Sequence, residues 1–253
     1  MFKDEFQAVC NGGAAKLNLL KKNPVGYFVS AMVAGMFIAF GGFVAFTLGY
    51  YVKAGGAAAW EKAALSAAFA AALSLVVMAG AELFTGNNFV MASASMRKVV
   101  SWKDTAVLWV VCWIGNLAGS LISVGIFNIA GCADGDKGAY FAGIASGKVA
   151  LEPVPLIAKA ILCNILVCLA VWCATKMKSE SGKLIMIFWC IFVFMVCGFE
   201  HSIADMSIEG VALFNGDITI GSYFYSVLLA TLGNMIGGIV FVALPYHIIS
   251  KEK

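Results

Sequence analysis

Two stretches decide the fold: GAELFTGNN at residues 80–88 and GFEHSIADM at residues 198–206. Each places a carboxylate and small polar residues inside a long apolar segment. Glu82 and Glu200 are 118 positions apart (200 − 82), and Asn116 and Asn234 have the same separation (234 − 116). A constant offset indicates an internal repeat. Because polar groups are costly inside a bilayer and usually mark a transport path, the sequence predicts a channel or transporter whose pore lies where two half-repeats meet.

The composition indicates an integral membrane protein. Hydrophobic residues make up 62% of the 253-residue chain and charged residues only 12%, with a mean hydropathy of +0.92, whereas soluble domains carry roughly 25% charged residues. The apolar runs are continuous rather than alternating, which predicts helical spans and not a β-barrel. At about 20 residues for each span, six helices fit. The predicted spans are 25–49, 63–85, 105–130, 154–175, 184–206 and 221–249.

Three spans in each repeat is an odd number, so the second repeat runs inverted through the membrane. Inverted repeats with interrupted helices place the permeation site near the midplane. The sequence therefore predicts an all-α polytopic fold with one transmembrane domain over 25–249. Its repeats cover about 25–130 and 154–249, and its second and fifth helices are broken.

The matched stretches set where we expect the interruptions. We expect the second helix to resume as a short piece, Phe89–Met96, after the polar residues Gly86-Asn87-Asn88. Ahead of the domain, residues 1–24 form a separate segment. Within it, residues 1–22 are expected to lie on the membrane surface as an amphipathic helix interrupted at Gly12-Gly13. Residues 250–253 are expected to be a short tail.

Loop charge predicts the orientation. One set of loops and ends carries twelve basic residues and the opposite set four, so both termini are expected in the cytoplasm. The larger set comprises Lys3, Lys16, Lys21, Lys22, Arg97, Lys98, Lys103, Lys176, Lys178, Lys183, Lys251 and Lys253. The smaller set comprises Lys53, Lys62, Lys137 and Lys148.

His201 is the strongest candidate for pore chemistry. The chain has two histidines, and His201 lies deep in the fifth span beside Glu200. A histidine can take or release a proton near neutral pH, although a buried histidine can also serve structure alone. Glu82 and Glu200 are expected to support the breaks by accepting hydrogen bonds from backbone amides of the broken helices. Asn164 and Asn234 are either ligands for a permeating solute or ties between helices.

Other classes of protein are less consistent with the residues. No His-Glu-x-x-His motif, serine elbow or Cys-x-x-Cys pair is present, so we expect no catalytic residues, no metal site and no cofactor. An aquaporin should carry two Asn-Pro-Ala boxes, which this chain lacks. A sodium-coupled transporter should place more acidic residues at mid-depth. A membrane enzyme, an aquaporin-like solute channel and a sodium-coupled transporter remain as alternatives.

Several segments resemble the formate/nitrite transporter family over nearly the whole chain. They are NPVG at 23–26, AELFTG at 81–86, CNILVCLAVW at 163–172, GFEHSIA at 198–204 and TLGN at 231–234. The resemblance implies an aquaporin-like helical fold. It also implies a homopentamer with one pore in each protomer.

The resemblance also implies roles for particular residues. Thr85 would bind the central histidine, His201, and Lys148 would draw anions into the outer vestibule. The implied constriction residues are Phe69 and Leu73 on the cytoplasmic side, Phe84 and Phe194 on the outer side, and Leu83 in the loop that breaks the second span. One departure is Asp205, where the family pattern has asparagine.

The function implied is a channel or transporter, not an enzyme, for small monovalent anions of weak acids. We favour hydrosulfide, followed by nitrite and formate. We expect the anion to share a proton with His201 or a nearby water and to cross as the neutral acid, since an idealised bare ion loses on the order of 20 kcal/mol of hydration. The expected location is a bacterial cytoplasmic membrane, with protons and lipid, but no nucleic acid, as partners.

Overall fold

Helices form all the regular structure in residues 1–251, the part of the chain that the computed structural model describes. The α-helices are α1 Lys3–Lys22, α2 Pro24–Ala54, α3 Glu61–Leu75, α4 Phe84–Met96, α5 Trp102–Ile129, α6 Gly135–Val149, α7 Pro153–Lys176, α8 Glu180–Cys197, α9 Ser202–Asn215, α10 Ile220–Gly238 and α11 Leu244–Ile249. A 3-10 turn, Ala58–Trp60, precedes α3, and π-helical turns follow α3 and α10 at Val76–Gly80 and Ile239–Ala243.

Six helical segments of the described chain are long and apolar enough to cross a membrane, which confirms the predicted number. They are Pro24–Ala54, Ala58–Gly80, Trp102–Ile129, Pro153–Lys176, Glu180–Cys197 and Ile220–Ile249. The fold is the expected all-α polytopic one, with two inverted three-helix repeats.

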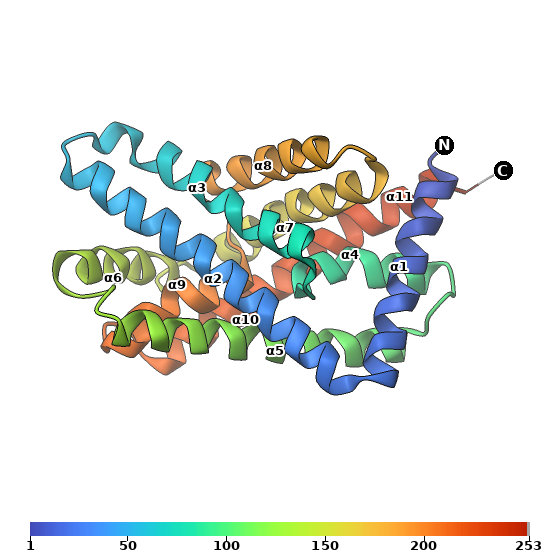
Figure 1. Cartoon of the computed structure of the whole chain (residues 1–253), viewed down its shortest axis with the longest axis horizontal. Coiled ribbons are helices and arrows are strands. Elements are labelled where there is room, and N and C mark those ends of the chain that lie inside the picture. Colours follow the sequence, from blue (N-terminus) through green and yellow to red (C-terminus); the bar gives the residue numbers. More distant parts are fainter. Residues whose placement is uncertain (252–253) are drawn as a thin grey trace.

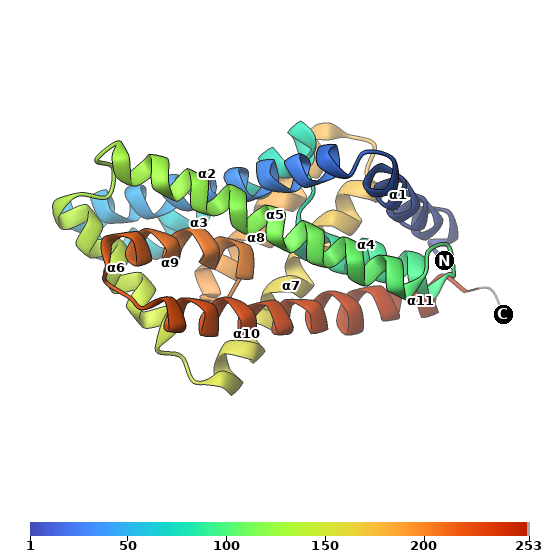
Figure 2. The ribbon, with the colours of Figure 1, turned by 90° about the horizontal axis from the view of Figure 1, so that it is seen from below.

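The two ends of the bundle are built differently. α1 lies across one end, where both chain termini are found (Figure 1). α6 and α9 lie towards the opposite end, with the long helices α5 and α10 running between the two ends (Figure 2). We call these the α1 side and the α6 side.

The second and fifth spans are broken, as expected, but the first break lies earlier than the sequence suggested. α3 ends in the π-helical turn, Ala81 and Leu83 have extended backbone angles, and α4 begins at Phe84. The prediction that Gly86-Asn87-Asn88 form the break is therefore wrong, because these residues lie in the first turns of α4. In the fifth span, Gly198 ends α8 with φ +71° and α9 begins at Ser202.

The segments outside the spans also differ from expectation. α1 is continuous through Gly12-Gly13 and lies against α4, where Gly13 permits contact with Ala94. Its apolar residues are therefore buried by protein rather than by the membrane surface. The helix α6, within the loop between the third and fourth spans, was not predicted. In the expected tail, Ser250 accepts hydrogen bonds from Arg97, and residues 252–253 lie outside the described part.

Glycines bring two pairs of helices into backbone contact. A Cβ at Gly119 of α5 would lie 1.9 Å from the carbonyl oxygen of Met32 in α2. A Cβ at Gly237 of α10 would lie 2.4 Å from the carbonyl oxygen of Ile161 in α7. These glycines are one repeat apart (237 − 119 = 118). The two halves therefore use the same close crossing, which fixes the helices that carry Asn116 and Asn234.

We predict that Gly119→Val lowers the thermal unfolding midpoint of the purified protein in detergent. The side chain must displace a backbone carbonyl, and overpacking of this kind costs about 1–3 kcal/mol or more. Gly143→Ala is the matched control, because a Cβ there meets no atom within 4 Å. Equal midpoints for the two variants would show that the α2–α5 crossing tolerates a side chain.

Candidate pore and its central histidine

Three hollows lie in series through the protein. The α6-side vestibule has a volume of about 510 Å³ and shares Phe194 and His201 with a central cavity of about 10 Å³. The central cavity shares Leu73 and Leu83 with the α1-side vestibule of about 380 Å³. A cavity of about 10–15 Å³ accommodates roughly one water molecule. The path is therefore open at both ends and closed to a hydrated ion in the middle.

His201 is the polar residue of this central cavity; the other lining residues that the structure describes are apolar. Its side chain caps the start of α9, since the backbone N–H of Ala204 donates to Nδ1 at 3.1 Å. Nδ1 is thus an acceptor, so the neutral ring carries its proton on Nε2. Nε2 lies 3.0 Å from Oγ1 of Thr85, to which it donates. The expected contact between Thr85 and His201 is present.

Two asparagines hold the two breaks in the same way. Asn116 accepts a hydrogen bond from the N–H of Phe84 at 2.9 Å and donates to the carbonyl oxygens of Ala31 and Glu82 at 2.7 and 2.9 Å. The first break is thereby tied to α5, which carries Asn116, and to α2, which carries Ala31.

In the second half, Asn234 accepts from the N–H of Ser202 at 2.9 Å and donates to the carbonyl oxygens of Ala160 and Glu200 at 2.8 and 3.0 Å. Its amide is fully used by backbone groups. Of the two roles left open for Asn234, these bonds supply the tie between helices.

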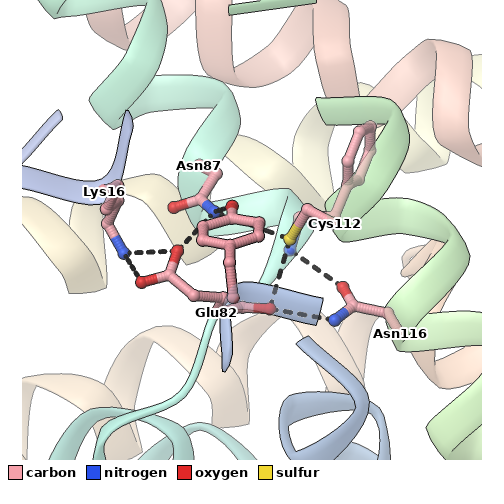
Figure 3. A network of polar contacts seen from close by, with 7 residues as sticks. Lys16, Glu82, Asn87, Cys112 and Asn116 are labelled. Atoms are coloured by element: carbon pink, nitrogen blue, oxygen red, sulfur yellow. Dashed lines mark hydrogen bonds and ion pairs between the residues drawn. The ribbon is translucent and has the colours of Figure 1, made fainter. Parts of the chain in front are cut away.

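Glu82 lies in a polar network on the α1 side (Figure 3). Its carboxylate accepts from Lys16 of α1 at 2.7 and 2.8 Å and from the side-chain amide of Asn87 at 2.9 Å. Its carbonyl oxygen accepts from Cys112 at 3.2 Å. The expected donors, backbone amides of the broken helix, are thus replaced by side chains.

Glu200 is the counterpart on the α6 side. Lys148 of α6 donates to Glu200 and, at 2.8 Å, to Asp205. Burial alone would lower the pKa of Lys148, but the adjacent carboxylates of Asp205 and Glu200 raise it above its ordinary value. Lys148 therefore remains charged, and it lines the α6-side vestibule.

The other predicted residues are all buried in the described structure. Phe69 and Phe194 face each other edge to face at 6.0 Å and line the central cavity. Leu73 and Leu83 lie between that cavity and the α1-side vestibule. Phe84 lines none of the three hollows. The expected constriction formed by Phe84 and Phe194 is therefore wrong, because Phe194 packs against Phe69 instead.

Asn164 also ties elements together. Its side-chain amide donates to the carbonyl oxygens of Asn234 at 2.7 Å and Thr85 at 3.3 Å, and to Asn88 at 3.1 Å. Its own side-chain oxygen is buried without a partner in the described structure. The side chain therefore leaves one acceptor free beside Thr85.

Two buried polar residues near the site, Asn87 and Glu209, were given no role from the sequence. Asn87 lies in the stretch at residues 80–88, and its side-chain amide donates a hydrogen bond to Glu82. It is the repeat equivalent of Asp205 (205 − 87 = 118). Glu209 is fully buried in α9, where Ser226 donates to its Oε1 at 2.7 Å. The sequence signal that could have identified Glu209 is a carboxylate within the mostly apolar run between Met206 and Phe214.

A bundle of six spans with two broken helices meeting at a buried histidine, between two vestibules, defines a membrane channel or transporter. The family model described as formate/nitrite transporter matches residues 3–248. The chain therefore belongs to the formate/nitrite transporter family, and it is a membrane transport protein rather than an enzyme.

Relatives and solved structures agree with this assignment. The chain is 31% identical to the nitrite transporter NirC of Escherichia coli, covering 97% of this chain and 91% of the relative. It is 38% identical to a probable formate transporter of Methanothermobacter thermautotrophicus, covering 92% of each. A solved FNT family ion channel superimposes with a TM-score of 0.93 at 29% identity, covering 99% of this chain and 100% of that one. A pentameric formate channel with formate bound gives 0.75 at 28% identity, covering 90% and 98%.

We predict that Asn116→Leu destabilises the protein and abolishes transport. The substitution leaves the N–H of Phe84 without a partner inside the bundle and removes the hydrogen bonds to the carbonyl oxygens of Ala31 and Glu82. An unsatisfied buried group costs about 1–3 kcal/mol. The readouts are the thermal unfolding midpoint in detergent and solute flux in proteoliposomes.

Asn128→Leu is the control on the same helix, because Asn128 binds only a side chain, that of Asn215, at the half-buried end of α5. An Asn116→Leu variant that unfolds like Asn128→Leu would mean that the first break does not depend on Asn116.

Proposed function

We propose that this chain forms a homopentameric channel for small monovalent anions of weak acids, with formate, nitrite and hydrosulfide as substrates. The observation that carries the proposal is the central cavity, in which one neutral histidine is the polar residue between two wide vestibules. Support for the substrate class comes from relatives whose names specify nitrite and formate, and from the solved pentameric channel that holds formate.

Attraction is the first step. Lysine side chains of the α6-side vestibule, Lys62, Lys148 and Lys159, supply positive charge at that mouth. The broken helices α4 and α9 both begin at the centre, so the positive ends of their dipoles face the path. An anion is thus drawn to the edge of the narrow region while it is still hydrated.

Desolvation is the second step. A central cavity for about one water molecule admits formate, nitrite or hydrosulfide only after they lose their hydration. The apolar rings of Phe69 and Phe194 and the side chains of Leu73 and Leu83 offer the bare anion no hydrogen bonds. Acquiring a proton removes most of this cost, which favours passage of the weak acid in its neutral form.

His201 is the third element. Its Nε2–H donates to Thr85, and the ring is held neutral because a second proton on Nδ1 would displace the N–H of Ala204. We infer that the Nε2–H of His201 donates a hydrogen bond to the passing anion, either directly or through the Thr85 hydroxyl or a water molecule. The proton that neutralises the anion comes from water in the vestibule and returns to water on the far side, and the ring keeps its own proton throughout.

The preference for hydrosulfide rests on features of the sequence. They are the Leu83-Phe84-Thr85-Gly86 form of the break and the eight cysteines, which suit an anaerobic, sulfide-containing habitat. The proposed location is a bacterial plasma membrane with both termini, and so the α1 side, in the cytoplasm, as the distribution of lysine and arginine indicates. Ranking the three anions in proteoliposomes, with glycerol as the excluded solute, tests the substrate proposal.

We predict that His201→Asn lowers formate and nitrite flux by about tenfold or more. An asparagine can still cap α9, but the proton donor to Thr85 is lost, and a lost interaction of about 1.4 kcal/mol corresponds to tenfold in rate. Stopped-flow measurements on proteoliposomes at several pH values provide the rates.

Thr85→Val is the companion variant, because it keeps the shape of the side chain and removes the hydroxyl that accepts from His201. We expect it to reduce flux in the same direction. Unchanged flux in His201→Asn would refute the proposed hydrogen bond from this ring to the anion. Glycerol flux without anion flux in the wild type would refute the substrate class.

A further inference from the structure

The two halves of the protein differ in charge at equivalent positions. In the first half, Glu82 is neutralised by Lys16 and receives a further hydrogen bond from the neutral amide of Asn87. In the second half, the residue equivalent to Asn87 is Asp205 (87 + 118). Asp205 cannot donate to Glu200 when it is ionised. Instead, both carboxylates accept from the same ammonium group, that of Lys148.

A third carboxylate lies one helical turn further along α9. Glu209 stands where the first half has Met91 (91 + 118 = 209). Residues four apart on a helix face the same way, with Cβ atoms about 5–6 Å apart, so Glu209 lies beside Asp205. With every group ionised, Lys148, Glu200, Asp205 and Glu209 would carry a net charge of −2.

Burial makes that fully ionised state unfavourable. Asp205 and Glu209 each have 0% of their surface exposed. Their second carboxylate oxygens, Oδ2 and Oε2, are buried without a hydrogen-bond partner in the described structure. An isolated carboxylate in such surroundings takes up a proton rather than remain charged. Asp205 also lines the α6-side vestibule, which gives protons a route from solution.

We propose that Asp205 and Glu209 form a buried proton-binding site that controls how strongly Lys148 attracts anions at the α6-side mouth. This proposal rests on the anion-channel function put forward above. When the pair is ionised, the cluster of Lys148, Glu200, Asp205 and Glu209 carries a net charge of −2, and the vestibule attracts anions weakly. Each proton that the pair takes up makes the cluster less negative by one charge, so anion flux from that side rises.

The groups facing the pair come from several elements. They are Lys148 of α6, Cys163 of α7, Glu200 and His201 of the break, and Tyr223 and Ser226 of α10. Lys148 is the cation among them, and it is already shared. Of these groups, Ser226 donates a hydrogen bond to Glu209, and Lys148 donates one to Asp205. Protons on the pair are thus the available means of reducing the remaining negative charge.

The test compares nitrite influx through the wild type and Asp205→Asn in proteoliposomes, from mildly acidic to mildly alkaline pH. Asparagine restores the residue found in the first half and mimics the protonated form. We expect flux roughly threefold to tenfold above wild type at alkaline pH, because the cluster around Lys148 then carries one negative charge fewer. The two proteins should converge at acidic pH. Asp217→Asn, which removes an exposed carboxylate after α9, should follow the wild type throughout.

A second measurement reads the proton directly. Infrared spectra of the intact protein should contain a C=O stretching band of a protonated carboxyl group that is lost or shifted in Asp205→Asn and Glu209→Gln. If Asp205→Asn fails to assemble, the pH profile of Glu209→Gln and its infrared band test the proposal instead. Superimposed pH profiles with an unchanged band would overturn the proposal. A wild type without anion flux would refute the channel function, while the band would still test the proton site.

Discussion

The structure depends on satisfying the backbone where two membrane helices are interrupted. Inside a bilayer no water is available for free N–H and C=O groups, so an interruption persists only where protein groups replace the missing helical bonds. Asn116 and Asn234 do this from continuous helices, each with one accepted and two donated hydrogen bonds. The glycine crossings at Gly119 and Gly237 set the positions of those asparagines, since they bring the carrying helices into contact with their neighbours. The site geometry follows from this arrangement, because the breaks aim α4 and α9 at the same point.

The internal repeat allowed much of this to be predicted. A constant offset of 118 residues identified the breaks and the paired asparagines and carboxylates, and the odd number of spans in each half gave the inversion. The contact of Thr85 with His201 followed from the family resemblance. The position of the first break did not follow, because glycine and asparagine at 86–88 look like helix breakers. What decides the start of α4 is a hydrogen bond from Phe84 to Asn116, a tertiary contact across 32 positions. Helix propensity depends on residues that are close in the sequence, so it cannot indicate such a contact.

The ionic partners of the two glutamates were harder to predict for the same reason. Lys16 lies 66 positions before Glu82, and Lys148 lies 52 before Glu200. Each lysine comes from a helix outside the six spans: α1, which the sequence placed on the membrane surface, and α6, which it did not predict. Both helices are amphipathic or glycine-rich segments whose conformation is set by packing on the bundle. Their charged side chains therefore reach groups that no pattern in the spans could indicate.

The repeat also shows where the two mouths of the path have diverged. On the α1 side, one lysine meets one carboxylate and a neutral amide, so the charges balance without any proton. On the α6 side, one lysine meets two carboxylates, with a third behind them, and a balance requires protons or cations. The apolar centre is common to both halves, because it is formed where they meet. His201 meets solutes arriving from either side, so it cannot make the effect of pH differ between the two directions of transport. Any such difference must arise at the mouths, where the two halves of the sequence differ.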